Sequence, residues 1–403
     1  MSAPQREESE APAGGMAEAR LKWDRLRNPP LRAPQAGRLA NISDKRVDPL
    51  VKSKWDQGGY GPPYIYDYYT TPNHYPSGCT ATAAAQLMRY HKHPDTPVGT
   101  VACTYSVYGS VQTGTLLGGD GYGGAYRWDD MPLDPYYSVL SLAQRQAIGA
   151  INWDVGRASK MDYGDYYDGG SAAWLSDLSR ALKKTFLYGN AVFGGQENDT
   201  MANIPPAALK KMINPNLDAS LPVLLGIYAT PLTGHSMVAD GYGYNDSTLY
   251  HHLNMGWSGL DDAWYNLPDI LIPDFLDFTV VSACVYNIFP QGKGEIISGR
   301  VTDKNGNPLS DVSITAARSG GDTFTAVTNS RGIYALAKIP SASSYTISAS
   351  KAGYNFRSRT VSTLTSSKVT GTVGNVWGVN FSDADPPVPV KNISEILLLL
   401  LLN

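Results

Sequence analysis

Residues 76–94 read PSGCTATAAAQLMRYHKHP, and this stretch predicts a helix over residues 80–90 that begins directly after a cysteine. The small residues of TATAAA let such a helix pack closely inside a domain, and Gly78 permits a backbone conformation that a side chain would strain. At a helix N-terminus, free N–H groups and the positive end of the dipole favour the thiolate of Cys79 over its thiol. Cys79 is therefore either an activated nucleophile or a small buried residue that starts a helix.

A cysteine nucleophile needs a base, and His235 in the segment GHSMVADGYG is the best placed of the six histidines. Gly234 precedes it at the start of a predicted strand, where an imidazole can project into a cleft. In the later segment NMGWSG, the Asn254 amide is available to orient that imidazole and Trp257 to shield the bond from water. Taken singly, these segments also fit a structural histidine and a strand that ends in a glycine-rich turn.

The remaining metal-ligating residue types argue against a metal site. His251 and His252 are adjacent in a predicted strand, so they face opposite sides and cannot hold one ion together. The three cysteines, Cys79, Cys103 and Cys284, contain no CxxC pair and are too few for a disulfide framework. We expect at least one free thiol, no metal and no cofactor.

Composition narrows the class of partner. The formal net charge is −3 and no run of Lys or Arg forms a stripe, which argues against a nucleic-acid partner. Charged residues make up 17% of the chain, with 26 Tyr and 40 Gly, whereas an average domain has about 25% charged residues. This suggests the polar, loop-rich surface of a secreted protein. The apolar run at 396–402 is far shorter than the roughly 20 residues of a bilayer span, so no transmembrane segment is expected.

The length of 403 residues predicts two domains. The first, at 46–291, is expected to be α+β, because predicted helices precede predicted strands; the helices are at 80–90, 138–151 and 172–186, and the strands at 221–229, 234–243 and 248–257. The second, at 292–385, has short β-branched runs between Gly, Asn, Pro and Ser turns, which predicts a small antiparallel β-sandwich. We expect residues 1–45 to be a disordered arm, or a leader or propeptide remnant, and 386–403 a Pro-rich linker with an apolar tail.

Several segments occur in the order and spacing of one known family: WDQGGYGPPY, SGCTATAAAQLMRYHKHP, YRWDDMP, MDYG, GHSMVADGYG and LNMGWSGLDDAWYNL. Over residues 55–290 the chain resembles the streptopain-like cysteine peptidases, which implies a papain-like fold for the first domain. The segments GRVTDKNGNPLSDVSI and TNSRGIYALAKIPSASSYTISASKAGY resemble the carboxypeptidase-regulatory-like, immunoglobulin-like modules of secreted bacterial enzymes.

The resemblance to this family implies peptide-bond hydrolysis through an acyl-enzyme thioester. Cys79 matches the family's nucleophile and His235 its general base. Asn254 matches the residue associated with orienting the imidazole. Gln57, in WDQ, falls where the family has an oxyanion-hole side chain that works with the backbone N–H of Cys79.

Further positions follow from the same resemblance. Ser171 and Gly234 fall where backbone contacts to substrate are expected, and Trp257 retains an active-site indole. Met255 departs from the family, because it replaces an aromatic residue thought to cover the active-site hydrogen bond.

The resulting hypothesis is a secreted or cell-surface cysteine endopeptidase with a Cys–His thiolate–imidazolium pair. Its partners would be protein or peptide substrates, with contact to a cell surface or matrix through the β-sandwich. Two alternatives stay open: a catalytically silent papain-fold binding or adhesin protein, favoured by Met255, and a thiol acyl or peptide transferase, in which an amine captures the acyl-enzyme in place of water.

Overall fold

The computed structural model describes residues 38–59, 61–70, 73–136, 138–165, 168–195, 202–229, 233–272, 276–368 and 371–383. The predicted tail at 386–403 and residues 1–37 of the predicted arm lie outside these described residues. The chain divides into two units between Lys293 and Gly294, and Ser367–Gly371 groups with the first unit. The start predicted for the second domain, residue 292, lies close to this division.

The first unit is built on a sheet with nine strands in its described part, in the order β1-β10-β9-β8-β7-β12-β11, with β2 paired to β8 and β6 to β12. The pairs in this sheet are antiparallel. The strands are β1 (Arg38–Leu39), β2 (Asp44–Val47), β6 (Asn190–Gly195), β7 (Val223–Ala229), β8 (Thr233–Asn245), β9 (Thr248–Asn254), β10 (Ala263–Tyr265), β11 (Ile270–Leu271) and β12 (Asp277–Phe289).

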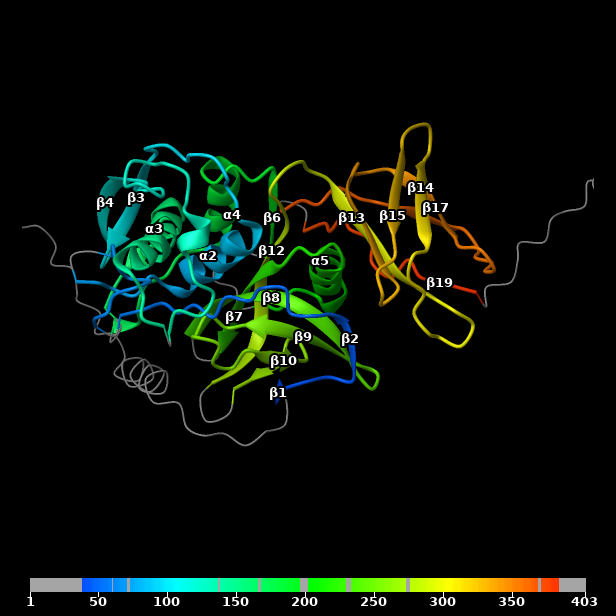
Figure 1. The fold of residues 1–403 in the computed structure, drawn as a ribbon, viewed down its shortest axis with the longest axis horizontal. Helices are drawn as coiled ribbons and strands as arrows, with labels where there is room; N and C mark the ends of the chain where they lie inside the picture. Colours follow the sequence, from blue (N-terminus) through cyan, green and yellow to red (C-terminus); the bar gives the residue numbers. More distant parts are fainter. Residues whose placement is uncertain are drawn as a thin grey trace, which may run out of the picture. The chain divides into compact units, whose positions relative to one another are not determined.

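Helices gather beside this sheet. In Figure 1 the helices α2, α3 and α4 lie together next to the β3–β4 hairpin, and α2 packs against both α3 and the strand β8. The helices are α2 (Cys79–His91), η1 (Trp128–Asp130), α3 (Leu142–Ala158), α4 (Leu175–Lys184) and α5 (Pro206–Asp218), and the hairpin is β3 (Ala102–Val107) with β4 (Ser110–Thr115). A short parallel strand, β5 (Asp162–Tyr163), pairs with β3. The α+β prediction for this unit is confirmed.

Local sequence explains where these helices begin and end. α2 follows Gly78, which has φ 86°, and ends at Lys92 in a left-handed conformation, with its N–H bound to the carbonyl of Arg89. α3 begins later than predicted because Ser141 and Gln144 form a capping box, in which each side chain binds the other's backbone N–H. The predicted helices are thus confirmed with shifted boundaries.

The predicted arm was extended too far along the chain. Residues 38–39 form β1, which pairs with β10, and β2 pairs with β8. These short strands are ordered by backbone hydrogen bonds to strands about 200 residues later in the chain. So few residues show no periodic pattern from which pairing of this kind could be predicted. The first unit therefore begins by Arg38, not at residue 46.

The second unit consists of two sheets that share one hydrophobic core. One sheet has the order β16-β13-β19 and the other β15-β14-β17-β18. The strands are β13 (Glu295–Thr302), β14 (Ser313–Arg318), β15 (Thr323–Val327), β16 (Ile333–Ile339), β17 (Ser344–Ser350), β18 (Arg359–Ser362) and β19 (Phe381–Ser382). Side chains in β17 alternate between buried and exposed, as a strand with one face on a core requires. The predicted sandwich is confirmed, with the β13–β19 pair parallel.

Among the helices of the described residues, none is both long and apolar enough to cross a lipid bilayer.

Candidate active site

Cys79 is the first residue of α2 and is half-buried. No side chain caps the helix, so the first N–H groups face the space around the sulfur. The other two cysteines are in less reactive surroundings, because burial raises the thiol pKa of Cys103 and, more strongly, that of Cys284. A thiolate is the reactive form of cysteine, so Cys79 is the best-placed nucleophile of the three.

Gly78 cannot be replaced without strain. It has φ 86° and ψ 148°, a conformation open essentially to glycine alone. A Cβ atom at this position would lie 2.7 Å from the backbone oxygen of Ser171 and 2.9 Å from Cε of Met161. The chain thus brings Ser171, predicted to contact substrate through its backbone, directly against the residue before Cys79. Ser171 itself is buried, and its Oγ accepts a 3.4 Å hydrogen bond from the N–H of Gly164.

Gln57 lies on the other side of the cysteine loop. Its backbone oxygen accepts hydrogen bonds from Ser77, from the N–H at 2.8 Å and from the hydroxyl at 3.1 Å, which ties it to the residue two before Cys79. The side chain is 4% exposed, yet Nε2 has no hydrogen-bond partner among the described residues. Buried polar groups are nearly always paired. An amide left in this state is available to a group that arrives with the substrate.

His235 lies near the start of β8 and is 3% exposed. Its Nε2 lies 2.8 Å from the backbone oxygen of Met255. Because a carbonyl oxygen only accepts hydrogen bonds, the neutral imidazole carries its proton on Nε2 and its lone pair on Nδ1. The Trp257 ring lies 4.6 Å from the imidazole, with a tilt of 32°, and is itself buried. Trp257 is therefore in contact with the imidazole, and the covering role expected of it stays a prediction.

The contact expected between Asn254 and the imidazole is not the one that the structure contains. Oδ1 of Asn254 instead accepts hydrogen bonds from Nε2 of Gln86 at 2.9 Å and from the N–H of Gly256 at 3.1 Å. Its Nδ2 donates to the backbone oxygen of Ser53 at 2.8 Å. The amide links α2 to the turn after β9, while the next residue, Met255, supplies the oxygen that orients the imidazole. A backbone carbonyl is present in every residue, so sequence reasoning had no signal for it.

The cysteine and histidine segments meet through their neighbours. The hydroxyl of Thr80, directly after Cys79, lies 3.1 Å from that of Ser236, directly after His235. Thr80 also donates to the backbone oxygen of Ala173 at 2.9 Å. The start of α2 is thereby held against both β8 and the segment that follows Ser171.

Gly234 is exposed at the edge of this region and pairs with Tyr228 across β7 and β8. A Cβ atom on Gly234 would lie 2.9 Å from the Tyr228 ring, so a larger residue would displace that ring. Its predicted backbone contact with substrate stays a prediction.

The other histidines are engaged elsewhere. His251 Nε2 lies 2.8 Å from Oδ1 of Asn214, and His252 Nδ1 lies 2.7 Å from Oδ1 of Asp240. These partners come from α5 and β8, so the two rings face opposite sides, as predicted. Burial lowers the pKa of His251 to about 3, which keeps this ring neutral near neutral pH.

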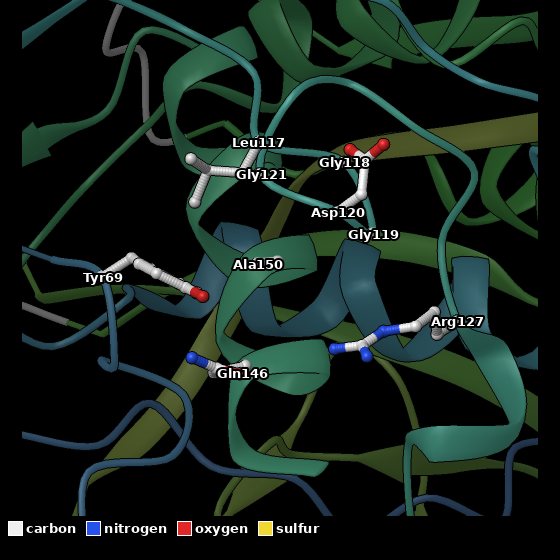
Figure 2. A pocket seen from close by; sticks show the side chains of 9 residues that line it. All are labelled: Tyr69, Leu117, Gly118, Gly119, Asp120, Gly121, Arg127, Gln146 and Ala150. Carbon is white, nitrogen blue, oxygen red and sulfur yellow. The ribbon is translucent and has the colours of Figure 1, made fainter. Parts of the chain in front are cut away.

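A separate hollow of about 240 Å³ lies beside α3. Figure 2 shows the Tyr69 hydroxyl and the Gln146 amide pointing toward one another, with the Arg127 guanidinium across from them. Its lining contains no thiol or imidazole and includes none of the residues discussed around Cys79. We therefore place the candidate active site at Cys79 and not at this hollow.

Comparisons with known proteins identify the family of the first unit and of the second. The sequence model of the peptidase C10 family matches residues 55–265, and that of the carboxypeptidase regulatory-like domain matches residues 296–376. Streptopain of Streptococcus pyogenes is 30% identical over 215 residues, which cover 50% of this chain and 48% of streptopain. The thiol protease/hemagglutinin PrtT of Porphyromonas gingivalis is 29% identical over 236 residues, which cover 57% of this chain and 24% of that protein. The chain thus spans about half the length of streptopain.

A solved structure supports the fold. Active wild-type interpain A cysteine protease of Prevotella intermedia superimposes with a TM-score of 0.51 at 23% identity, covering 64% of this chain and all of that chain. At this identity the likeness concerns the fold alone, and it agrees with the papain-like fold expected of the first unit.

Proposed function

The chain belongs to the peptidase C10 family, and from that premise we propose that it is a cysteine endopeptidase. The observation that carries the proposal is the Gln57 amide nitrogen, which is buried without a hydrogen-bond partner among the described residues, beside the cysteine loop. Leaving a buried donor unpaired costs about 1–3 kcal/mol. An enzyme recovers this cost when an oxyanion forms, whereas a protein that only binds has no such use for the donor.

In the acylation step, the Cys79 thiolate attacks the carbonyl carbon of the scissile peptide bond and a C–S bond forms. The carbonyl oxygen takes the electron pair of its π bond and becomes an oxyanion. Gln57 Nε2 and the Cys79 backbone N–H donate hydrogen bonds to this oxyanion. The C–N bond then breaks, and the leaving amine takes a proton from the His235 imidazolium. A thioester remains on Cys79.

Deacylation reverses these roles. A water molecule attacks the thioester carbon while the His235 imidazole takes its proton. The C–S bond breaks, and the thiolate forms again as the acid product departs. The Met255 carbonyl oxygen supports both steps because it holds the proton-bearing Nε2 in place and directs Nδ1 to the chemistry. Asn254 acts one step further away, by fixing the turn to α2.

Substrate would bind along the segments on either side of Cys79 and His235. We propose that backbone groups of Ser171 and Gly234 hold the substrate chain in extended form, since Ser171 abuts Gly78 and Gly234 precedes the base. We propose further that the protein acts outside the cell or at its surface, in keeping with its low content of charged residues. The carboxypeptidase regulatory-like domain would then serve as a spacer or attachment module.

The test of the peptidase proposal is hydrolysis of a denatured protein and of fluorogenic peptides by the parent, Cys79→Ala and Cys103→Ala chains. Removal of the nucleophile should lower kcat by at least about 10⁴-fold, with the thermal unfolding midpoint nearly unchanged. Cys103 is also half-buried but lies on β3, so its variant should keep parental turnover. Equal turnover in the Cys79→Ala and parent chains would refute the proposal.

Two further measurements separate the alternatives. A parent chain that hydrolyses nothing and whose Cys79 reacts with iodoacetamide no faster than an ordinary thiol, of pKa about 8.5, would be a binding protein with a retained fold. Products that carry an added amine, detected by mass spectrometry when glycinamide is present, would identify a transferase.

A further inference from the structure

Asp262 lies behind the residue that orients the imidazole. Its Oδ1 accepts a 2.7 Å hydrogen bond from the backbone N–H of Met255. The backbone oxygen of the same residue lies 2.8 Å from His235 Nε2. One residue therefore connects a carboxyl group to the imidazole through two successive hydrogen bonds.

Met255 needs such an anchor because it has left the sheet. β9 ends at Asn254, and the turn that follows contains several residues with positive φ, among them Gly256 at 66°, Ser258 at 54° and Gly259 at 81°. The N–H of Met255 is bound by a side chain in place of a neighbouring strand. Without Asp262, the Met255 N–H would lose its hydrogen-bond acceptor, and the Met255 carbonyl would be placed only by the rest of the turn, which Asn254 links to α2.

Both burial and neighbouring charged groups affect the pKa of the Asp262 carboxyl. Burial raises the pKa of the Asp262 carboxyl to about 7, and the Met255 N–H and His252 on β9 oppose this increase. Asp240 on β8 and the adjacent Asp261 add to the increase, and Asp261 also pairs with Arg38 of β1. Both the ionised and the protonated carboxyl keep an oxygen that accepts the Met255 N–H, and the ionised form binds it more strongly.

We propose that Asp262 is a positioning residue of this site, which holds the Met255 N–H and so places the Met255 carbonyl oxygen that orients His235. The inference rests on the proposed function. Small displacements of a catalytic group cost up to about 10²-fold in rate. Loss of the Asp262 acceptor should therefore lower turnover without removing any group that contacts substrate.

The test compares Asp262→Ala and Asp262→Leu, which lack the acceptor, with Asp262→Asn, which keeps an amide oxygen, and Asp269→Ala. The control residue Asp269 is an exposed aspartate shortly after β10. The first readout is the pH dependence of Cys79 alkylation by iodoacetamide, which needs no substrate. The second is the separation of kcat from KM for a fluorogenic peptide, and thermal unfolding shows which variants are folded.

In the folded Ala and Leu variants we expect kcat to fall by about 10–100-fold, with KM changed less than about 2-fold. Labelling of Cys79 below pH 7 should slow in the same variants, because the imidazole no longer pairs well with the thiolate. Asp262→Asn should restore most of both properties, and Asp269→Ala should match the parent. Leu keeps the branched shape of the Asp side chain and leaves no cavity, so it serves if the Ala variant does not fold.

Folded Ala or Leu variants with the labelling profile of Asp269→Ala would overturn the inference, as would a parent with no fast labelling below pH 7. A parent that labels rapidly but hydrolyses no peptide would instead contradict the proposed function. In that case a slower profile in the Ala and Leu variants would still support the positioning role of Asp262.

Discussion

The two units of the chain treat their buried polar groups differently. In the second unit, buried Glu295 accepts hydrogen bonds from the hydroxyls of Ser341 and Ser366 and from the N–H of Ser366, and buried Thr328 both accepts from Val312 and donates to Leu309. The buried side-chain nitrogen and oxygen atoms that lack a hydrogen-bond partner all fall in the first unit, as far as the structure describes the chain.

This difference is consistent with a catalytic role for the first unit and a structural role for the second. A domain that only needs to be stable gains by pairing every buried polar group. A domain that stabilises a transient charge keeps a donor ready for it, at a cost in stability. The second unit also contains no Cys or His after residue 294, so it supplies neither of the side chains proposed for the chemistry. Changes in the first unit should therefore affect catalysis, and changes in the second should affect stability alone.

Among the changes that test this difference between the two units, we expect Gln57→Ala to have the largest effect. Loss of one oxyanion donor should lower kcat by about 10²–10³-fold, or about 3–4 kcal/mol of barrier. Removal of the unpaired donor relieves its desolvation cost while truncation of the buried side chain leaves a cavity, so the two effects oppose each other and the unfolding midpoint should change little. Gln112→Ala, on the exposed strand β4, is the matched control. A variant with parental kcat would show that the unpaired amide has no catalytic use.

Gly78→Ala should have the next largest effect, because it combines strain with a close contact to the Ser171 backbone. We expect a loss of about 2–3 kcal/mol in the free energy of unfolding of the first unit, together with slower alkylation of Cys79. Gly121 also has φ 86°, but a Cβ atom added there would have no other atom within 4 Å, so Gly121→Ala is the control for a positive-φ glycine without a close contact. Equal effects at both positions would mean that the contact with Ser171 is unimportant.

The buried histidine His251 of the first unit predicts a pH dependence of stability, and the second unit contains no histidine. The folded-state pKa of His251 is about 3, below the value of about 6.5 in an unfolded chain. Below pH 6.5 the unfolded state binds a proton that the folded state excludes, so stability is full above pH 6.5 and is lost as the pH falls toward 3.

Between pH 7 and pH 5, the stability of the parent relative to His251→Gln should thus fall by about 2 kcal/mol, measured by urea unfolding. The variant His74→Gln, at a partly exposed ring stacked on Tyr64, is the control. A parent–variant difference that does not change with pH would contradict the buried, neutral state of His251.

The smallest effect is expected in the second unit, from Thr328→Val. This change keeps the shape but removes both hydrogen bonds of the buried hydroxyl, which should cost about 1–2 kcal/mol in the unfolding of this unit. Exposed Thr346→Val on β17 is the control. Peptide hydrolysis should stay at the parental rate in both variants. A fall in kcat for Thr328→Val would contradict the expectation that changes in the second unit affect stability alone.

Much of the site was predictable from residue types. The place of Cys79 at the start of a helix was recognisable from the glycine before it and the run of small residues after it, and the expected neighbourhood of Trp257 and His235 is present. The contact assigned to Asn254 was wrong, because which atom reaches an imidazole depends on the path of a turn with several positive φ angles. The anchor Asp262 was missed for the same reason, since it acts through a backbone N–H.

The sequence by itself determined the two-part architecture and the helix after Cys79, and it supplied Cys79 and His235 as the candidate nucleophile and base, because periodicity, glycine positions and reactive side chains follow directly from residue types. Only the tertiary structure decided that residues 38–47 pair into the sheet, that Gln57 Nε2 is buried without a partner among the described residues, and that the Met255 carbonyl orients the imidazole. These features depend on backbone groups and on desolvation. Every residue except proline carries the same backbone groups, and the burial of a side chain is decided by the whole folded chain.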